Sequence, residues 1–126
     1  GRRLLMVSAG TASAPELLSY SMEPPTVDLK NVYRRFLNAS KEVPEVDVRD
    51  GCVTCTLLES RLAYGNFSNW YYDYKDLKNA YYFTSPVNND IFTKSGSMQL
   101  NVGKYYTIVF GGNQELGYNF IPLEEY

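Results

Sequence analysis

The sequence predicts an all-β fold, an immunoglobulin-like antiparallel β-sandwich with an N-terminal strand or hairpin arm. Residue types that favour strands are abundant, because 12 Tyr and 6 Phe accompany Val, Ile and Thr. Glycines and prolines interrupt the chain at short intervals, which leaves room for short strands but little for a long helix. At 126 residues the chain has the length of one domain.

Ten segments between these turn signals are expected to be strands. They span residues 4–9, 17–22, 32–38, 45–49, 56–62, 69–74, 80–84, 96–101, 104–110 and 118–123. The first two form an apolar strand, a loop of small residues and a second strand. Pro24-Pro25 then favours an extended connector. We therefore expect residues 1–30 to be an arm or hairpin that reaches a neighbouring subunit, and residues 31–126 to be the sandwich.

The middle strands follow from turns and alternation. Asn38-Ala39-Ser40 is typical of a turn that ends a strand, because Asn and Ser side chains bond nearby backbone. Val46 and Val48 share a face opposite Asp47. Asp50-Gly51 predicts the turn into residues 56–62. A helix at residues 16–21 or 73–82 is an alternative, although neither has sustained apolar spacing.

The last strands are the most apolar. Met98 and Leu100 share a face, and residues 101–104 are expected to turn this strand back into residues 104–110 as a hairpin. Residues 104–110 are apolar on both faces, which predicts a central strand. The predicted core is Val46, Val48, Leu62, Trp70, Met98, Leu100, Tyr106, Ile108 and Phe110.

Charge and composition exclude several function classes. The net charge of −2 without a basic run argues against nucleic-acid binding. The absence of His removes Ser-His-Asp and Cys-His catalysis and His metal ligands. Glu45 and Asp47 share one strand face and could lie as close together as the carboxylates of a glycosidase, but solvated strand charges are the favoured interpretation. We therefore expect no enzyme, no catalytic residue, no metal and no cofactor.

The N-terminal apolar run, Leu4, Leu5, Met6 and Val7, is too short for a transmembrane segment or for the core of a signal peptide. We therefore expect it to belong to the mature protein and to contribute to a subunit contact. Strand addition and strand exchange are both open for residues 1–22, and the opposing interpretation pairs them within their own sandwich.

Cys52 and Cys55 form the motif Cys-Val-Thr-Cys after a tight turn. A redox site would need a helix N-terminus, and a zinc site would need two more ligands. Disulfide bonding is therefore favoured, either between the two cysteines or with another subunit, and free thiols are the alternative.

An aromatic cluster follows further along the chain. Its members are Trp70, Tyr71, Tyr72, Tyr74, Tyr81 and Tyr82. Because successive strand residues face opposite ways, some of these side chains should be exposed. Exposed aromatics favour protein interfaces and also stack on sugars. The expected partner is a second copy of the chain, with a glycan possible.

From about residue 32 to 125 the chain resembles the domain of unknown function 4397, a bacterial family of secreted or surface β-sandwich domains. Four blocks in order carry the resemblance: residues 33–48, residues 62–70 with Leu-Ala-Tyr-Gly, residues 100–109, and the end Pro-Leu-Glu-Glu. Residues 41–44 and 78–83 and the two cysteines depart from the family pattern. The resemblance implies an extracellular or cell-surface location and supplies no catalytic residue.

These observations together predict a non-enzymatic structural subunit of an extracellular or surface assembly, such as a filament, a spore surface or an envelope layer. The contacts would be made by strands, aromatic side chains and disulfides. The alternative is a carbohydrate-binding or adhesive module that uses the Trp/Tyr cluster as its stacking platform.

Overall fold

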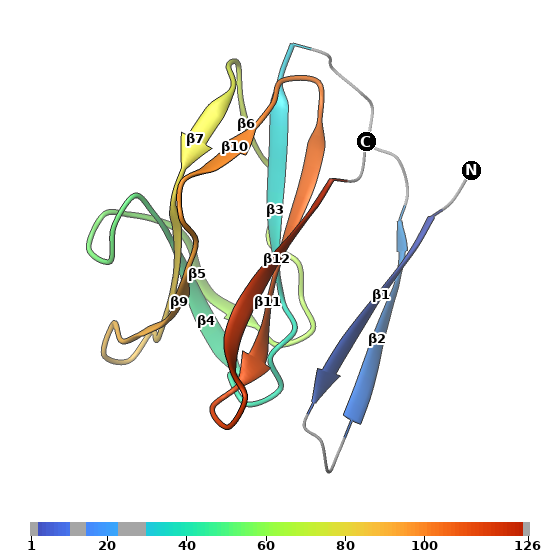
Figure 1. Cartoon of the computed structure of the whole chain (residues 1–126), viewed down its shortest axis with the longest axis vertical. Helices are drawn as coiled ribbons and strands as arrows, with labels where there is room; N and C mark the ends of the chain where they lie inside the picture. The colour runs from blue at the N-terminus through green and yellow to red at the C-terminus, as the bar shows by residue number, and fades with distance from the viewer. Residues whose placement is uncertain (1–2, 11–14, 23–29, 125–126) are drawn as a thin grey trace.

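A computed structural model of the chain describes residues 3–10, 15–22 and 30–124. In these residues every regular element is a strand, which confirms the all-β prediction (Figure 1). The strands are β1 (Arg3–Gly10), β2 (Pro15–Met22), β3 (Val32–Asn38), β4 (Glu45–Asp50), β5 (Thr56–Ala63), β6 (Tyr71–Asp73), β7 (Leu77–Asn79), β8 (Tyr81–Thr84), β9 (Ile91–Lys94), β10 (Met98–Leu100), β11 (Tyr105–Asn113) and β12 (Gly117–Glu124).

Two four-stranded sheets face each other and form the predicted sandwich. The first sheet has the order β12-β11-β3-β6 and the second has the order β5-β4-β8-β9. A short pair, β10 with β7, closes one end. Strands β1 and β2 pair only with each other among the described strands, and their hairpin lies outside the sandwich, beside the first sheet (Figure 1).

Alternation along β3 and β11 divides the apolar residues between two faces of the first sheet. Phe36 and Ile108 point inward and are fully buried against the second sheet. Leu37 and Val109 point outward and belong to a separate buried cluster. The inner core consists of Val32, Phe36, Val43, Val46, Val48, Leu62, Leu77, Tyr81, Phe83, Leu100, Tyr106, Ile108 and Phe110.

Two of the nine predicted core residues are only half-buried. Met98 is half-buried and packs against the edge of the core, in the short β10. Trp70 is half-buried and lies against Tyr105, on the outer face of the first sheet. It precedes β6, where the alternation sends Tyr71 toward the interior instead.

The strand pairing corrects the expected hairpin at residues 101–104. The turn is present, but β10 pairs with β7 and not with β11. Both edges of β11 are occupied, by antiparallel β12 and by parallel β3. The chain therefore crosses from the closing pair into the middle of the first sheet, and the sandwich is antiparallel apart from this parallel pairing among the described strands.

The prediction lacked two short strands, β7 and β9, and neither helix that was considered as an alternative is present. Residues 16–21 lie in β2 and residues 73–82 extend over β6 to β8. At three and four residues, β7 and β9 are too short to show an alternating pattern. In the part of the chain that the structure describes, no helix is long and apolar enough to cross a membrane.

The Asn38-Ala39-Ser40 turn joins the two sheets. The Asn38 amide donates to the carbonyls of Val43 (2.9 Å) and Leu62 (3.0 Å), and its oxygen accepts the Ser40 N–H. The Ala39 N–H donates to Phe110 in β11. This confirms that the motif bonds neighbouring backbone as predicted, and it adds a buried link from β3 to β5.

Candidate interaction surface

The hairpin of β1 and β2 packs on the outer face of the first sheet. Its ladder runs without a break from the Arg3–Met22 pair to the Gly10–Pro15 pair. The cluster between hairpin and sheet has a buried part formed by Leu37, Ala39 and Val109, and a partly buried part formed by Val7, Leu18, Tyr20, Phe67 and Leu123. We call this contact the hairpin interface. It exists because β3 and β11 carry large apolar residues on both faces.

Tyr20 is the anchor of the hairpin in this interface. Its ring meets Phe67 edge-on with centroids 4.6 Å apart, and its hydroxyl donates to the Gly65 carbonyl at 2.8 Å. Gly65 has a φ of +82°, which an L side chain would resist. Burial raises the pKa of Tyr20 above its ordinary value, so the hydroxyl stays a donor to a higher pH than that of an exposed tyrosine.

The hairpin interface is incompletely filled. A hollow of about 210 Å³ lies between hairpin and sheet, lined by Met6, Val7, Val109, Ile121 and Leu123. Met6 and Ile121 on its rim are 55% and 51% exposed. Apolar surface therefore continues past the part of the face that the hairpin covers.

Next to the interface the outer face carries a row of aromatic side chains around Arg35. The guanidinium lies 3.8 Å from the Phe67 centroid and 4.5 Å from that of Trp70, and its Nε donates to Thr107 Oγ1. Trp70 in turn meets Tyr105 edge-on. One face of the Trp70 indole is thus occupied by Arg35, which weakens Trp70 as a platform for a sugar.

The predicted aromatic cluster is divided among three places. Tyr72 and Tyr74 are 58% and 73% exposed and continue the row beyond Trp70. Tyr82 is half-buried on the outer face of the second sheet, opposite the inward Tyr81. Alternation accounts for the division, because it separates neighbours in sequence onto opposite faces.

The prediction that Tyr71 and Tyr81 are interface residues is wrong, because both point into the sandwich. Tyr81 is fully buried, and Tyr71 packs against the core while its hydroxyl donates to Leu58 and Glu59. Of the apolar N-terminal candidates, Met6 and Val7 line the hollow. The side chains of Leu4 and Leu5 lie outside the described part of the structure.

Sequence reasoning missed a buried arginine beside these two tyrosines. Arg34 is 7% exposed, and its guanidinium lies about 6 Å from the rings of Tyr71 (6.0 Å) and Tyr81 (5.9 Å). Its Nε and Nη1 are buried without a hydrogen-bond partner among the described residues, as is the Tyr81 hydroxyl. The alternation of Val32, Arg34 and Phe36 could have placed it inside.

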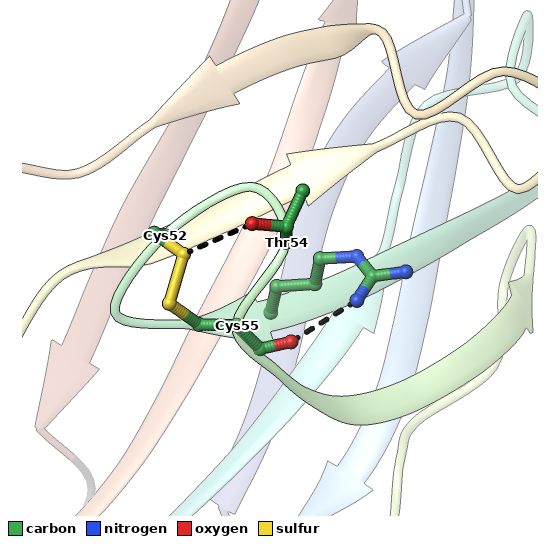
Figure 2. Close-up of a disulfide and its surroundings, with 4 residues drawn as sticks. Cys52, Thr54 and Cys55 are labelled. Carbon is green, nitrogen blue, oxygen red and sulfur yellow. Dashed lines mark hydrogen bonds between the residues drawn. A yellow bond between two sulfur atoms is a disulfide. The ribbon is translucent and has the colours of Figure 1, made fainter.

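Cys52 and Cys55 form a disulfide with each other, with Cα atoms 4.9 Å apart (Figure 2). The Cys52 sulfur lies 3.6 Å from the Thr54 hydroxyl, and Arg49 Nη1 donates to the Cys55 carbonyl at 3.1 Å. Of the two predicted pairings, this confirms the disulfide between the two cysteines of the same loop. This loop and the hairpin lie on opposite sides of the sandwich (Figure 1).

The carboxylates considered for glycosidase chemistry are engaged in holding β5. Glu45 forms an ion pair with Arg61 at 3.3 Å, and the buried Asp47 accepts the Arg61 N–H at 2.8 Å. Arg61 has a φ of +53°, at an irregularity in the pairing of β4 with β5. Within the described ranges no three His, Cys, Asp or Glu side chains are grouped to hold a metal ion.

Neither a protein-family model nor a curated protein sequence matches the chain. The resemblance to the domain of unknown function 4397 therefore stays a prediction, and the fold and surface described above carry the functional argument.

Proposed function

We propose that this protein is a non-enzymatic structural subunit that assembles with copies of itself on a cell surface or outside the cell. The observation that carries the proposal is the hairpin interface. There, a two-stranded element with a complete ladder of its own covers an apolar sheet face of the sandwich. An isolated two-stranded hairpin is only marginally stable in water, so this hairpin depends on packing against the sheet face that it covers.

Two further features support assembly at this surface. Apolar side chains remain exposed at the rim of the hollow, and the aromatic row ends in the exposed Tyr72 and Tyr74. Exposed apolar and tyrosine side chains gathered on one face are typical of protein contacts. The disulfide in an exposed loop is consistent with an oxidising compartment, which supports the extracellular proposal.

The alternative function is a carbohydrate-binding or adhesive module. Tyr72 and Tyr74 favour it, because their rings are exposed and adjacent, with centroids 5.9 Å apart. Their planes cross at 80°, however, so they do not form one flat platform. We therefore rank glycan binding second.

The test is the state of assembly of the full chain, followed by native mass spectrometry and negative-stain electron microscopy over a range of concentrations. We expect filaments or other ordered polymers that grow with concentration. A monodisperse monomer at every concentration, together with retention on a glycan array, would replace the proposal with the alternative.

A matched pair of variants ties assembly to the hairpin interface. Leu18 packs into the interface, whereas the next residue, Ser19, is exposed. Leu18→Asp should abolish the polymer while Ser19→Asp, which adds the same charge, leaves it intact. Equal assembly of the two variants would show that the polymer does not depend on the hairpin interface, and it would count against the proposal.

A further inference from the structure

We infer that the outer face of the first sheet is an acceptor for the hairpin of a second copy of this chain, so that subunits are joined by hairpin exchange. The inference rests on the proposed function and names the contact that would carry it. It selects exchange of a whole hairpin over addition of a single strand.

The construction of the hairpin permits exchange. All eight residue pairs of its ladder lie within the hairpin, so detaching the hairpin breaks no pairing between β1 or β2 and the other described strands. Among the described residues, its hold on its own sheet consists of apolar packing and the bond from Tyr20 to Gly65. Each of these contacts would form equally well on another copy. The exchange therefore conserves the contact energy, which is the basis of domain swapping.

The connector has the reach for a neighbouring copy. Residues 22 and 30 are separated by eight peptide steps, which span about 26 Å when extended. Loss of the hairpin would expose Leu37 and Val109, now 0% and 3% exposed, so each acceptor face needs a hairpin from some copy.

The edges of the sandwich disfavour the rival mode, strand addition. The outer strand β12 contains Pro122, which has no N–H for an added strand. On the other edges, β6 and β9 have only three and four residues, and β5 carries the irregular pairing and the left-handed Arg61. Short, interrupted edges of this kind protect sheets from added strands. The apolar face thus remains as the acceptor.

Donor and acceptor are different surfaces of the chain, so the contact is heterologous. A head-to-tail series of such contacts grows into an open chain unless the rotation closes it. In that series each hairpin covers the next copy's Leu37 and Val109, and the exposed Met6 and Ile121 come from two different copies at each hollow.

Cross-linking between two variants, each with one added cysteine, tests the inference. Met6→Cys and Ile121→Cys place thiols on the rim of one hollow, at exposed sites where substitution is tolerated. The native cysteines are paired with each other, so these thiols are the reactive ones. The two full-length variants are unfolded together, refolded as a mixture and treated with a short thiol-specific cross-linker. The control mixture replaces Ile121→Cys by Val87→Cys, which is 84% exposed on the loop between β8 and β9.

Exchange should give a Met6→Cys to Ile121→Cys product between chains at more than about tenfold the control yield, because docked sites experience millimolar effective concentrations. A yield at the control level would overturn the inference, provided that the double variant in one chain cross-links within itself. Filaments seen together with that negative result would leave the proposed function standing on another contact. A positive result confined to closed dimers would support exchange and contradict the polymer.

Discussion

Two buried regions lie on the two faces of β3 and β11 and are built from alternate residues of the same strands. They differ in which element of the chain covers them. Inside the sandwich, Phe36 and Ile108 are covered by a second sheet that continues directly along the chain. On the outer face, Leu37 and Val109 are equally buried, but they are covered by the β1–β2 hairpin, which precedes β3 in the chain and is joined to it by a connector. A hollow of about 210 Å³ lies beside this hairpin.

Burial alone therefore does not distinguish the inner core from the hairpin interface. The interior is filled by interdigitating aromatic rings, such as Phe83 stacked on Phe110 with centroids 5.2 Å apart. The hairpin interface has fewer fully buried side chains among the described residues and retains a hollow. We expect the interior to determine folding and the hairpin interface to respond to concentration and to partners.

Truncating one buried side chain in each region gives the largest contrast. Ile108→Ala should lower the free energy of unfolding by about 2–5 kcal/mol, because the surrounding core cannot close the cavity. Leu37→Ala should cost less, about 2 kcal/mol at the lower end of this range, because the hairpin can settle onto a smaller side chain. Urea unfolding measures both values. A larger loss for Leu37→Ala than for Ile108→Ala would reverse the assignment of core and interface.

Asn38→Ala should have the next largest effect, because it breaks the buried link between the sheets. The change leaves the carbonyls of Val43 and Leu62 without the amide donor and removes the acceptor of the Ser40 N–H. We expect a loss of about 2–4 kcal/mol in unfolding free energy. Asn88→Ala serves as the control, because Asn88 makes its hydrogen bonds in an exposed loop. Similar losses for the two variants would contradict the role assigned to Asn38.

The comparison also explains how much was predictable from the sequence. Alternation identified β4 and the central β11, and the Asn38-Ala39-Ser40 turn marked the end of β3. It could not reveal that β10 pairs with β7, since pairing depends on which edges of β11 are already occupied. The fold class was therefore predictable, while the partner of a short strand was not.

The candidate surface was predictable only in part. The apolar run at Met6 and Val7 indicated a covered strand, and the structure places both residues at the hollow. The tyrosine cluster was treated as one surface, although alternation alone would have sent Tyr71 and Tyr81 inward. The contacts of Arg35 join three separate segments, β3, residues 67–70 and β11, which no local pattern brings together.

Arg34 and Arg35 are adjacent in β3 and allow the interior and the outer face to be compared with the same type of side chain. Arg34 is buried in the interior, and two of its nitrogens have no hydrogen-bond partner within the described part of the chain. Arg35 on the outer face lies against Phe67 and Trp70 and donates to Thr107. Arg34→Met should leave stability unchanged or raise it by up to about 2 kcal/mol, because an unpaired buried charge is costly. Arg35→Met should lower it by about 1 kcal/mol. Thermal unfolding of both variants checks the signs, and a destabilised Arg34→Met variant would mean that the buried charge is paired.

The smallest expected effect at neutral pH is that of Tyr81→Phe. The Tyr81 hydroxyl is buried and has no hydrogen-bond partner among the residues that the structure describes, while the nearby Asn79 amide donates to Asp50. Removal of this hydroxyl should therefore change stability by less than about 0.5 kcal/mol. Tyr71→Phe should cost about 1 kcal/mol or more, because the Tyr71 hydroxyl donates to Leu58 and Glu59.

Alkaline pH should separate the Tyr81→Phe variant from the native chain. Burial is the main cause that raises the pKa of Tyr81 from 10.0 to about 12. Above pH 10 the unfolded chain therefore loses this proton while the folded chain keeps it, so stability is fully present below pH 10 and declines as the pH rises toward 12. In Tyr81→Phe this decline should be shallower, as urea titrations between pH 8 and 11.5 would show. An identical decline in both proteins would mean that Tyr81 ionises as freely in the folded state as in the unfolded one, which contradicts its place in the interior.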